Sequence, residues 1–224
     1  MIISSLKFVD FQDSLKCHSL TSQSKESFLP ISYEFKPGTV YGLISDFGCG
    51  SWGLTTCAGG RFTDQHTGKV LLNETEITAD ELAKYSCFIS ENIYPTLNTQ
   101  NDLLTPRTCI EKALSISLLP YSTEQIKSFF FLSEERFERS LAYVSGEIWL
   151  ISMAINFALG KQIFCYPWLN EIDIARFEIA YQHGIIKLLK DLGKIILVPS
   201  SQKKILRKKC DHTILFEKQK ITYQ

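Results

Sequence analysis

Long apolar runs are absent from this sequence, and so is an excess of charge of either sign. No run reaches the roughly 18 apolar residues that a membrane-spanning helix needs. The start, MIISSLKFVDF, lacks the basic end and apolar centre of a secretory signal. Lys and Arg total 24, as do Asp and Glu. The zero formal net charge disfavours nucleic-acid binding through a basic surface. The run KKILRKK is a local exception, which we expect to be a solvated helix face.

The cysteines form no C-x-x-C pair, and their number, seven, is odd. Several lie in apolar runs, which indicates reduced thiols in a cytosolic protein rather than a disulfide framework or a zinc site. The four histidines are scattered, and no metal site is expected.

The composition is that of a folded protein. Hydrophobic residues make up 45% of the 224 residues, which is ample for a core and makes disorder unexpected. This length suits one α/β domain, or one domain with a small insert, so residues 1–224 are taken as a single domain.

Strand signals dominate the first half of the chain, with one strand–loop–helix unit at its centre. The predicted elements are a strand–turn–strand over SYEFKPGTVYGLIS, a short helix over GLTTCAGG, a strand pair over GKVLLNETEIT and a short strand over YSCFIS.

The second half alternates helices with short apolar strands. Helical periodicity covers about residues 105–141, and GEIWLISMAINFALG predicts a largely buried helix. IARFEIAYQHGIIKLLKDLG predicts one amphipathic helix between the strands QIFCY and KIILVPS, and HTILFEKQKITY predicts a closing hairpin. This alternation favours an α/β fold with a parallel sheet and crossover helices.

The segment YGLISDFGCGSWGL has the form of a phosphate-binding loop that opens a helix. In the pattern G-x-x-x-x-G-K-[ST], backbone N–H groups face the phosphates and the last two side chains complete the site. Here Ser51 replaces the Lys and Trp52 replaces the hydroxyl residue. The loop either keeps a nest of N–H groups that attracts an anion, or is only a tight strand-to-helix turn. The candidate binding residues are Ser45, Gly48, Cys49, Gly50, Ser51 and Trp52.

From the first strand to the last hairpin, the order of these segments resembles the ATP-binding subunit of ABC transporters. The resemblance implies a P-loop NTPase-like ABC ATPase core with a parallel sheet, an antiparallel β layer and a helical insert over about 105–141. The matching segments are ISYEFKPGTVYGLISDFGCG, HTGKVLLNETEIT, FISENIYPTLNTQNDLL, YVSGEIWLISMAINFAL, IFCYPWLNEID, IILVPSSQ and CDHTILFEKQKI.

The resemblance also assigns family roles to positions of this chain, and most of them hold a different residue type. Ser51 and Trp52 take the Walker A Lys and hydroxyl positions, Glu91 the Q-loop Gln, Tyr166 and Pro167 the Walker B carboxylates, and Ser201 the switch His. The signature motif reads Tyr143, Val144, Ser145, Gly146 and Glu147, and Asp173 matches the D-loop. The adenine-stacking aromatic would be Phe11 or Phe8, although a role in the core explains either residue better.

Phosphoryl transfer depends on positioning and on neutralising charge. Ser51 brings no positive charge, Trp52 cannot ligate Mg²⁺, and Pro167 has no side-chain base. We therefore expect no catalytic residue, no required cofactor and no metal, with ATP bound weakly if at all. Glu91 and Glu147 are better explained as surface or interface residues.

Three functions are compatible with these residues. The first is an inactive subunit that pairs with a second ATP-binding subunit and a transmembrane transporter subunit, and that lies in the cytoplasm at the membrane through those partners. An apolar docking surface is predicted within residues 92–141. The second is a slow or unusual ATPase, and the third is a soluble scaffold or regulatory protein without nucleotide. The aromatic residues of the predicted docking surface are Tyr94, Tyr121, Phe129, Phe130 and Phe131.

Overall fold

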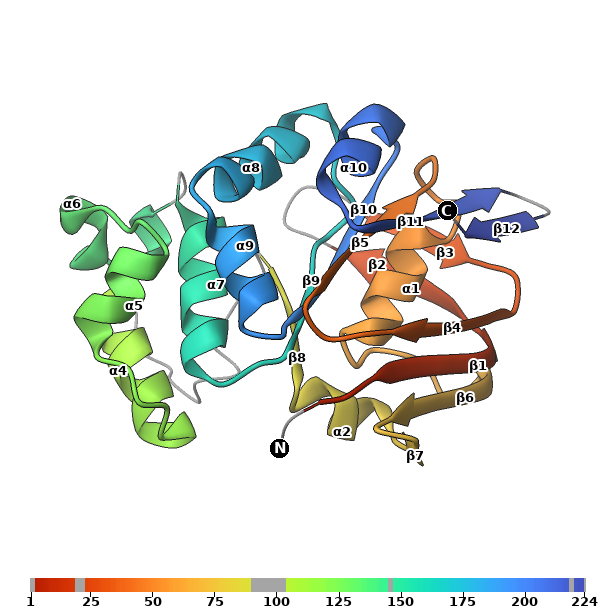
Figure 1. Ribbon diagram of the computed structural model, residues 1–224, viewed down its shortest axis with the longest axis horizontal. Coiled ribbons are helices and arrows are strands. Elements are labelled where there is room, and N and C mark those ends of the chain that lie inside the picture. Colours follow the sequence, from red (N-terminus) through yellow and green to blue (C-terminus); the bar gives the residue numbers. More distant parts are fainter. Residues whose placement is uncertain (1–2, 19–22, 90–103, 145–146, 218–219, 224) are drawn as a thin grey trace.

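A parallel sheet forms the centre of the molecule (Figure 1). The computed structural model describes residues 3–18, 23–89, 104–144, 147–217 and 220–223. The strand order is β12-β11-β5-β10-β9-β8, and every pair is parallel except the closing hairpin of β11 and β12. The expected parallel sheet is confirmed. Its strands are β5 (Thr39–Ile44), β8 (Ser86–Phe88), β9 (Ile163–Cys165), β10 (Ile195–Ser200), β11 (His212–Glu217) and β12 (Lys220–Tyr223).

An antiparallel sheet forms a second layer, in the order β4-β1-β6-β7. The predicted strand pair around Asn73 and Glu74 is present, and both residues have positive φ, at 51° and 63°. The Asn73 side chain accepts hydrogen bonds from the N–H groups of Ser4 and Ser5, which holds the turn against the chain start. The strands are β1 (Leu6–Gln12), β4 (Ile31–Phe35), β6 (Thr67–Leu72) and β7 (Thr75–Glu76).

A two-stranded hairpin, which the sequence did not predict, lies beside the second layer. It consists of β2 (Ser14–His18) and β3 (Gln23–Ser27), paired antiparallel. Both strands contact α1 (Ser51–Ala58), the helix that follows the glycine loop. Because every residue of α1 is buried, the helix is enclosed between the central sheet, the hairpin and the second layer (Figure 1).

Helices gather at the other end of the molecule (Figure 1). The predicted helical stretch over about 105–141 is confirmed, and Thr105 and Ser122 open two of its helices with reciprocal capping hydrogen bonds. This part packs on the helix predicted from GEIWLISMAINFALG. The helices are α4 (Pro106–Ser117), α5 (Thr123–Phe129), α6 (Glu134–Phe137), the 3₁₀ turn Leu141–Tyr143 and α7 (Ile148–Ala158), with the short α2 (Ala79–Ala83) earlier in the chain.

The predicted single amphipathic helix between β9 and β10 is wrong, since the chain forms two helices there. α8 (Glu171–Gln182) and α9 (Ile185–Asp191) are separated at Gly184, which has φ 76°. Glycine adopts this left-handed conformation without the steric cost that other residues have. The basic run forms α10 (Lys203–Lys209), and Leu206 within this helix is buried.

Two hydrophobic clusters cover the two faces of the central sheet. One joins the sheet to the helical end, and the other joins it to α1 and the antiparallel layer. The seven cysteines are free thiols, and burial raises the pKa of Cys17 and Cys87 to about 12. In the part of the chain that is described, no helix has the length and apolar character needed to cross a bilayer.

Candidate functional site

The glycine loop runs from the end of β5 to the start of α1, as its sequence predicted. Gly48 and Gly50 have φ values of 80° and 102°, which strongly favour glycine. The N–H of Cys49 donates to the carbonyl oxygen of Asp46 at 3.2 Å, and the N–H of Leu54 donates to that of Gly50 at 3.0 Å. Both glycines are therefore needed for the turn itself, whether or not a ligand binds there.

Ser51, which the loop pattern aligns with its lysine, points into the protein. It is fully buried, and its hydroxyl lies 2.5 Å from that of Ser45. The Ser45 hydroxyl donates its one proton to the carbonyl oxygen of Asp46, so Ser51 is the donor in the serine pair. This pair joins the two ends of the loop through neutral groups.

Aromatic rings surround the next position. Trp52 is 1% exposed, and its ring lies 5.8 Å from that of Phe47, which in turn lies 5.0 Å from Trp168. The indole N–H groups of Trp52 and Trp168 are buried and have no hydrogen-bond partner among the described residues. We call Phe47, Trp52 and Trp168 the aromatic cluster. Phe47 is 44% exposed, so one member of the cluster reaches the surface.

A buried carboxylate approaches the loop from the hairpin. Glu26 of β3 is 0% exposed, and its Oε2 accepts a hydrogen bond of 2.7 Å from the N–H of Gly50. Its other oxygen, Oε1, is buried without a hydrogen-bond partner in the described part of the chain. An anionic side chain of the protein therefore occupies one of the N–H groups that a phosphate-binding loop offers to its ligand.

The parallel strands bring further candidate residues to the loop, because their carboxyl ends meet at one edge. The N–H of Ser45 donates to the carbonyl oxygen of Ser200, and that of Leu169 to the carbonyl oxygen of Pro199. The edge thus joins the loop, the segment after β9 and the segment after β10. Tyr166 and Pro167, which follow β9, are buried, whereas Ser201, which follows β10, is half-buried.

Tyr166 is a core side chain in this structure. Its hydroxyl donates to the Met153 sulfur at 3.4 Å, and its ring packs edge-on against Phe177. Burial raises the Tyr166 pKa well above its ordinary value of 10. The hydroxyl therefore stays neutral and cannot serve as an anionic metal ligand at physiological pH.

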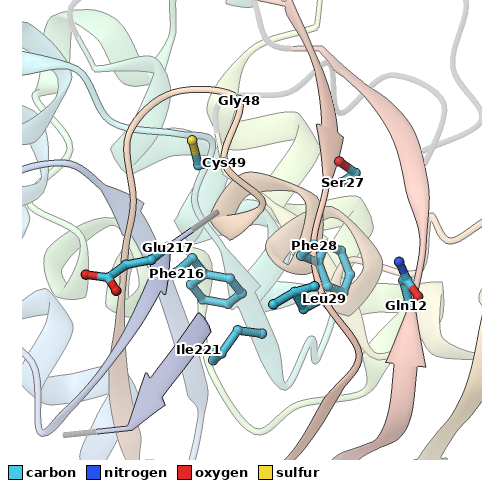
Figure 2. Close-up of a pocket in the computed structure, with 9 residues that line it drawn as sticks. All are labelled: Gln12, Ser27, Phe28, Leu29, Gly48, Cys49, Phe216, Glu217 and Ile221. Atoms are coloured by element: carbon cyan, nitrogen blue, oxygen red, sulfur yellow. The ribbon is translucent and has the colours of Figure 1, made fainter. Parts of the chain in front are cut away.

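Two adjacent pockets open beside the loop. The first, of about 390 Å³, has an apolar floor, and Figure 2 shows the loop with Gly48 and Cys49 above it. Among the described residues that line it there is no Lys or Arg, and the charged residue there, Glu217, directs its carboxylate away from the apolar side chains of Phe216, Leu29 and Ile221 (Figure 2). Its lining residues are Gln12, Ser27, Phe28, Leu29, Gly48, Cys49, Phe216, Glu217 and Ile221.

The second pocket, of about 260 Å³, lies at the strand ends. It contains two acidic residues, Asp46 and Glu217, and one basic residue, Lys203. Ser45, Cys49 and Ser201 also line it, so the structure brings these three candidate residues together. Within the described residues, no three His, Cys, Asp or Glu side chains are placed to hold a metal ion.

Comparison with solved structures identifies the fold. The chain superposes on CbiO1 of Clostridium perfringens, described as part of the ABC transporter complex CbiONQ, with a TM-score of 0.68, 13% identity, and 97% of this chain and 86% of that chain covered. A dimeric bacterial ABC transporter cassette superposes with a TM-score of 0.66 and 16% identity, with 97% of this chain and 98% of that chain covered. A Pyrococcus furiosus protein described as a putative ABC transporter ATP-binding protein superposes with a TM-score of 0.66 and 15% identity, with 95% of this chain and 98% of that chain covered. The fold is that of an ABC ATPase. No protein-family model and no curated protein sequence matches the chain.

Two described candidates, Glu147 from the signature segment and Asp173 from the D-loop segment, lie at helix starts. Glu147 precedes α7 and accepts hydrogen bonds of 3.2 Å from the N–H of Ser133 and from Arg136, which ties α6 to α7. Asp173, in the first turn of α8, accepts one of 3.0 Å from Arg176. Both carboxylates are thus engaged within the chain. Val144 is buried, while Glu91, Ser145 and Gly146 lie outside the described residues.

The adenine-stacking candidates of the ABC ATPase fold are core residues here. Phe11 and Phe8 are both 0% exposed, with ring centroids 5.0 Å apart. Phe11 also contacts Phe28, Phe62 and His66. Neither ring has an open face for a base in this conformation.

Sequence reasoning missed two charged residues near the loop. Glu26 lies in QSKES, a polar stretch without the alternation that would have marked it as inward-facing. Lys203 lies in the run that was expected to be only a solvated helix face. No local pattern marks Glu26; only the structure shows that Gly53 makes room for it, since a Cβ there would lie 3.0 Å from the Glu26 Cβ.

Proposed function

We propose that this chain is a subunit of an ABC transporter complex that does not itself hydrolyse ATP. In this proposal it pairs with a second ATP-binding subunit, contacts a transmembrane subunit, and lies on the cytoplasmic side of the membrane through these partners. The ABC ATPase fold supports the class of subunit, and the chemistry of the loop supports the absence of hydrolysis.

The aromatic cluster is the observation that carries the proposal. Phosphoryl transfer needs a cation on the phosphates, Mg²⁺ held by oxygen ligands and a group that orients the nucleophile. Trp52 fills the position of the metal-binding hydroxyl, and Trp168 follows the buried pair Tyr166 and Pro167 at the end of β9. Indole rings in these positions exclude water and offer no oxygen to a metal.

Exposed apolar side chains support the proposed interfaces. Phe47 is 44% exposed beside the loop, on the side where we propose contact with another ATP-binding chain. In the helical part, Phe130 is fully buried and Phe129 packs on Tyr121, but Phe131 is 53% exposed. Of the two anchors expected for the transmembrane subunit, Phe129 and Phe131, we therefore keep Phe131; Tyr94 lies outside the described residues.

The experiment is to purify the tagged chain from its own cells, identify co-purifying proteins and measure ATP hydrolysis by the chain alone. We expect a membrane protein and an intact ATP-binding subunit to co-purify, and hydrolysis no faster than background. Phe131→Glu should release the membrane protein, whereas Leu118→Glu is a matched control, because Leu118 is 83% exposed in the same helical part. A substitution of Gly146 by a bulky residue should weaken pairing with the ATP-binding subunit. If the unmodified chain purifies alone, the subunit proposal fails.

The strand-end pocket favours one alternative function, a slow ATPase. Lys203 and Asp46 line the same pocket as Ser45, so a cation and a potential metal ligand lie beside the loop. In that case, hydrolysis would persist through purification, require Mg²⁺ and be lost in Lys203→Ala. Hydrolysis that is unchanged in Lys203→Ala would instead indicate a contaminating enzyme.

A further inference from the structure

The N-terminus of α1 is a place where an anion is stabilised. The first N–H groups of a helix have no partner within the helix, and the helix dipole adds partial positive charge there. Gly50 is the residue immediately before α1, and Ser51 begins it. The first turn of α1 contains no acidic residue, so an acidic side chain at this end of the helix must come from another part of the chain.

Glu26 supplies that charge. Its Oε2 accepts the 2.7 Å hydrogen bond from Gly50, and the side chain is fully buried. Among the described residues, no Lys, Arg or His nitrogen lies within 4.0 Å of the Glu26 carboxylate, so Glu26 forms no ion pair. A buried carboxylate without an ionic partner is costly unless dipoles and hydrogen bonds stabilise it. Here the Gly50 N–H and the N-terminus of α1 face Oε2, while Oε1 has no hydrogen-bond partner among the described residues.

The hairpin is fitted closely to the loop that Glu26 contacts. A Cβ on Gly50 would lie 2.6 Å from the Phe28 Cβ, and one on Gly53 would lie 3.0 Å from the Glu26 Cβ. On the other hairpin strand, the Cys17 sulfur lies 3.2 Å from the Thr56 hydroxyl of α1. The hairpin and α1 thus meet along more than one turn of the helix, and glycines allow the contact at both closest points.

We propose that Glu26 is an internal ligand of the loop. Its carboxylate takes the place of a phosphate at the N-terminus of α1, and the β2–β3 hairpin that carries it closes the site. The loop is consequently ordered without nucleotide, and a phosphate chain can enter only by displacing a like charge together with the strand that holds it. This autoinhibitory contact follows from the geometry alone and does not depend on the proposed subunit function.

The test compares Glu26→Ala and Glu26→Gln with the unmodified full chain, using inorganic tripolyphosphate as the probe and calorimetry as the readout. Glu26→Ala opens the site, whereas Glu26→Gln keeps the size of the side chain and removes its charge. We expect each variant to bind tripolyphosphate measurably, with a dissociation constant at least about tenfold below the lower limit set for the unmodified chain, because one repulsive charge–charge contact is removed. Glu34→Ala is the matched control, since Glu34 is an exposed carboxylate on the neighbouring β4 and should give no gain.

A second readout does not depend on the variants folding. In the unmodified chain, the amide resonance of Gly50 should not move when tripolyphosphate is added, because Glu26 already accepts its hydrogen bond. A Gly50 shift that saturates in the unmodified chain overturns the proposal, and so does a folded Glu26 variant with unchanged affinity. Neither result affects the proposed function, which is tested by co-purification and by ATP hydrolysis.

Discussion

Gly50 lies where the loop comes closest to the hairpin, and replacing it measures how tightly the two are packed. With φ at 102°, the backbone at Gly50 is in a region that side chains strongly disfavour. A Cβ at this position would also lie 2.6 Å from the Phe28 Cβ and 2.9 Å from the Ser27 carbonyl oxygen. Gly50→Ala therefore combines a conformational cost with a steric one.

The magnitude follows from these two costs. A left-handed conformation costs a non-glycine residue about 1–2 kcal/mol, and overpacking against neighbours that cannot move freely costs about 1–3 kcal/mol. We expect Gly50→Ala to lower the free energy of unfolding by about 2–5 kcal/mol. Gly184→Ala is the matched control, because Gly184 has φ 76° and no heavy atom within 4 Å of its added Cβ.

Urea unfolding of the two variants and of the unmodified chain gives the three free energies of unfolding to be compared. Gly184→Ala should lose about 1–2 kcal/mol, which is the conformational cost alone. The additional loss in Gly50→Ala then measures the contact between hairpin and loop. If both variants lose the same free energy with the same denaturant dependence, β3 does not press on the loop, and the placement of Glu26 against Gly50 is wrong.

Substitutions at three further residues, Trp52, Glu147 and Lys194, test other parts of the molecule. Trp52→Ala should lower the free energy of unfolding by about 3 kcal/mol through the cavity it leaves, whereas Trp52→Phe should be close to neutral by urea unfolding because it removes an unpaired indole N–H. Glu147→Ala should cost about 1–2 kcal/mol by releasing Ser133 and Arg136, and thermal unfolding should show the loss with ATP hydrolysis unchanged. Burial lowers the pKa of Lys194 from 10.5 to about 8, so the unfolded chain binds more protons between these pH values and this residue's contribution to stability rises with pH. The free energy of unfolding of the unmodified chain, measured with urea and taken relative to that of Lys194→Met, should therefore rise by up to about 3 kcal/mol between pH 7 and pH 11.

Much of the fold could be predicted because its signals are local. Gly160 has φ 79° just after α7, and Gly60 has φ 78° just after α1, so both helix ends could be read from single residues. The strands β9 and β10 are short apolar runs buried on both faces, as in parallel sheets with helices on each side. The break at Gly184 was missed because the apolar spacing continues across it.

The candidate site was less predictable, because what occupies the loop comes from a distant part of the chain. The spacing of Gly48 and Gly50 correctly indicated a turn from strand to helix, but no local pattern relates Gly50 to Glu26, which is 24 residues away in the chain. The hairpin itself is polar at most positions, and the buried Leu15, Cys17 and Glu26 do not form an apolar face. Its position depends on tertiary contacts with α1, which override weak strand propensity.

The residues around the loop contact one another, so replacing Ser51 and Trp52 alone would not give the loop the surroundings of the phosphate-binding pattern. A lysine at position 51 would place its charge beside Glu26, where an internal ion pair would compete with any phosphate. A serine at position 52 would leave the space of a fully buried indole, with Phe47 and Trp168 still beside it. Even with both replacements, the carboxylate of Glu26 would still accept the Gly50 hydrogen bond. The hairpin, the aromatic cluster and the serine pair thus form one packed arrangement around the loop, and our proposal is that the same contacts keep a phosphate chain out.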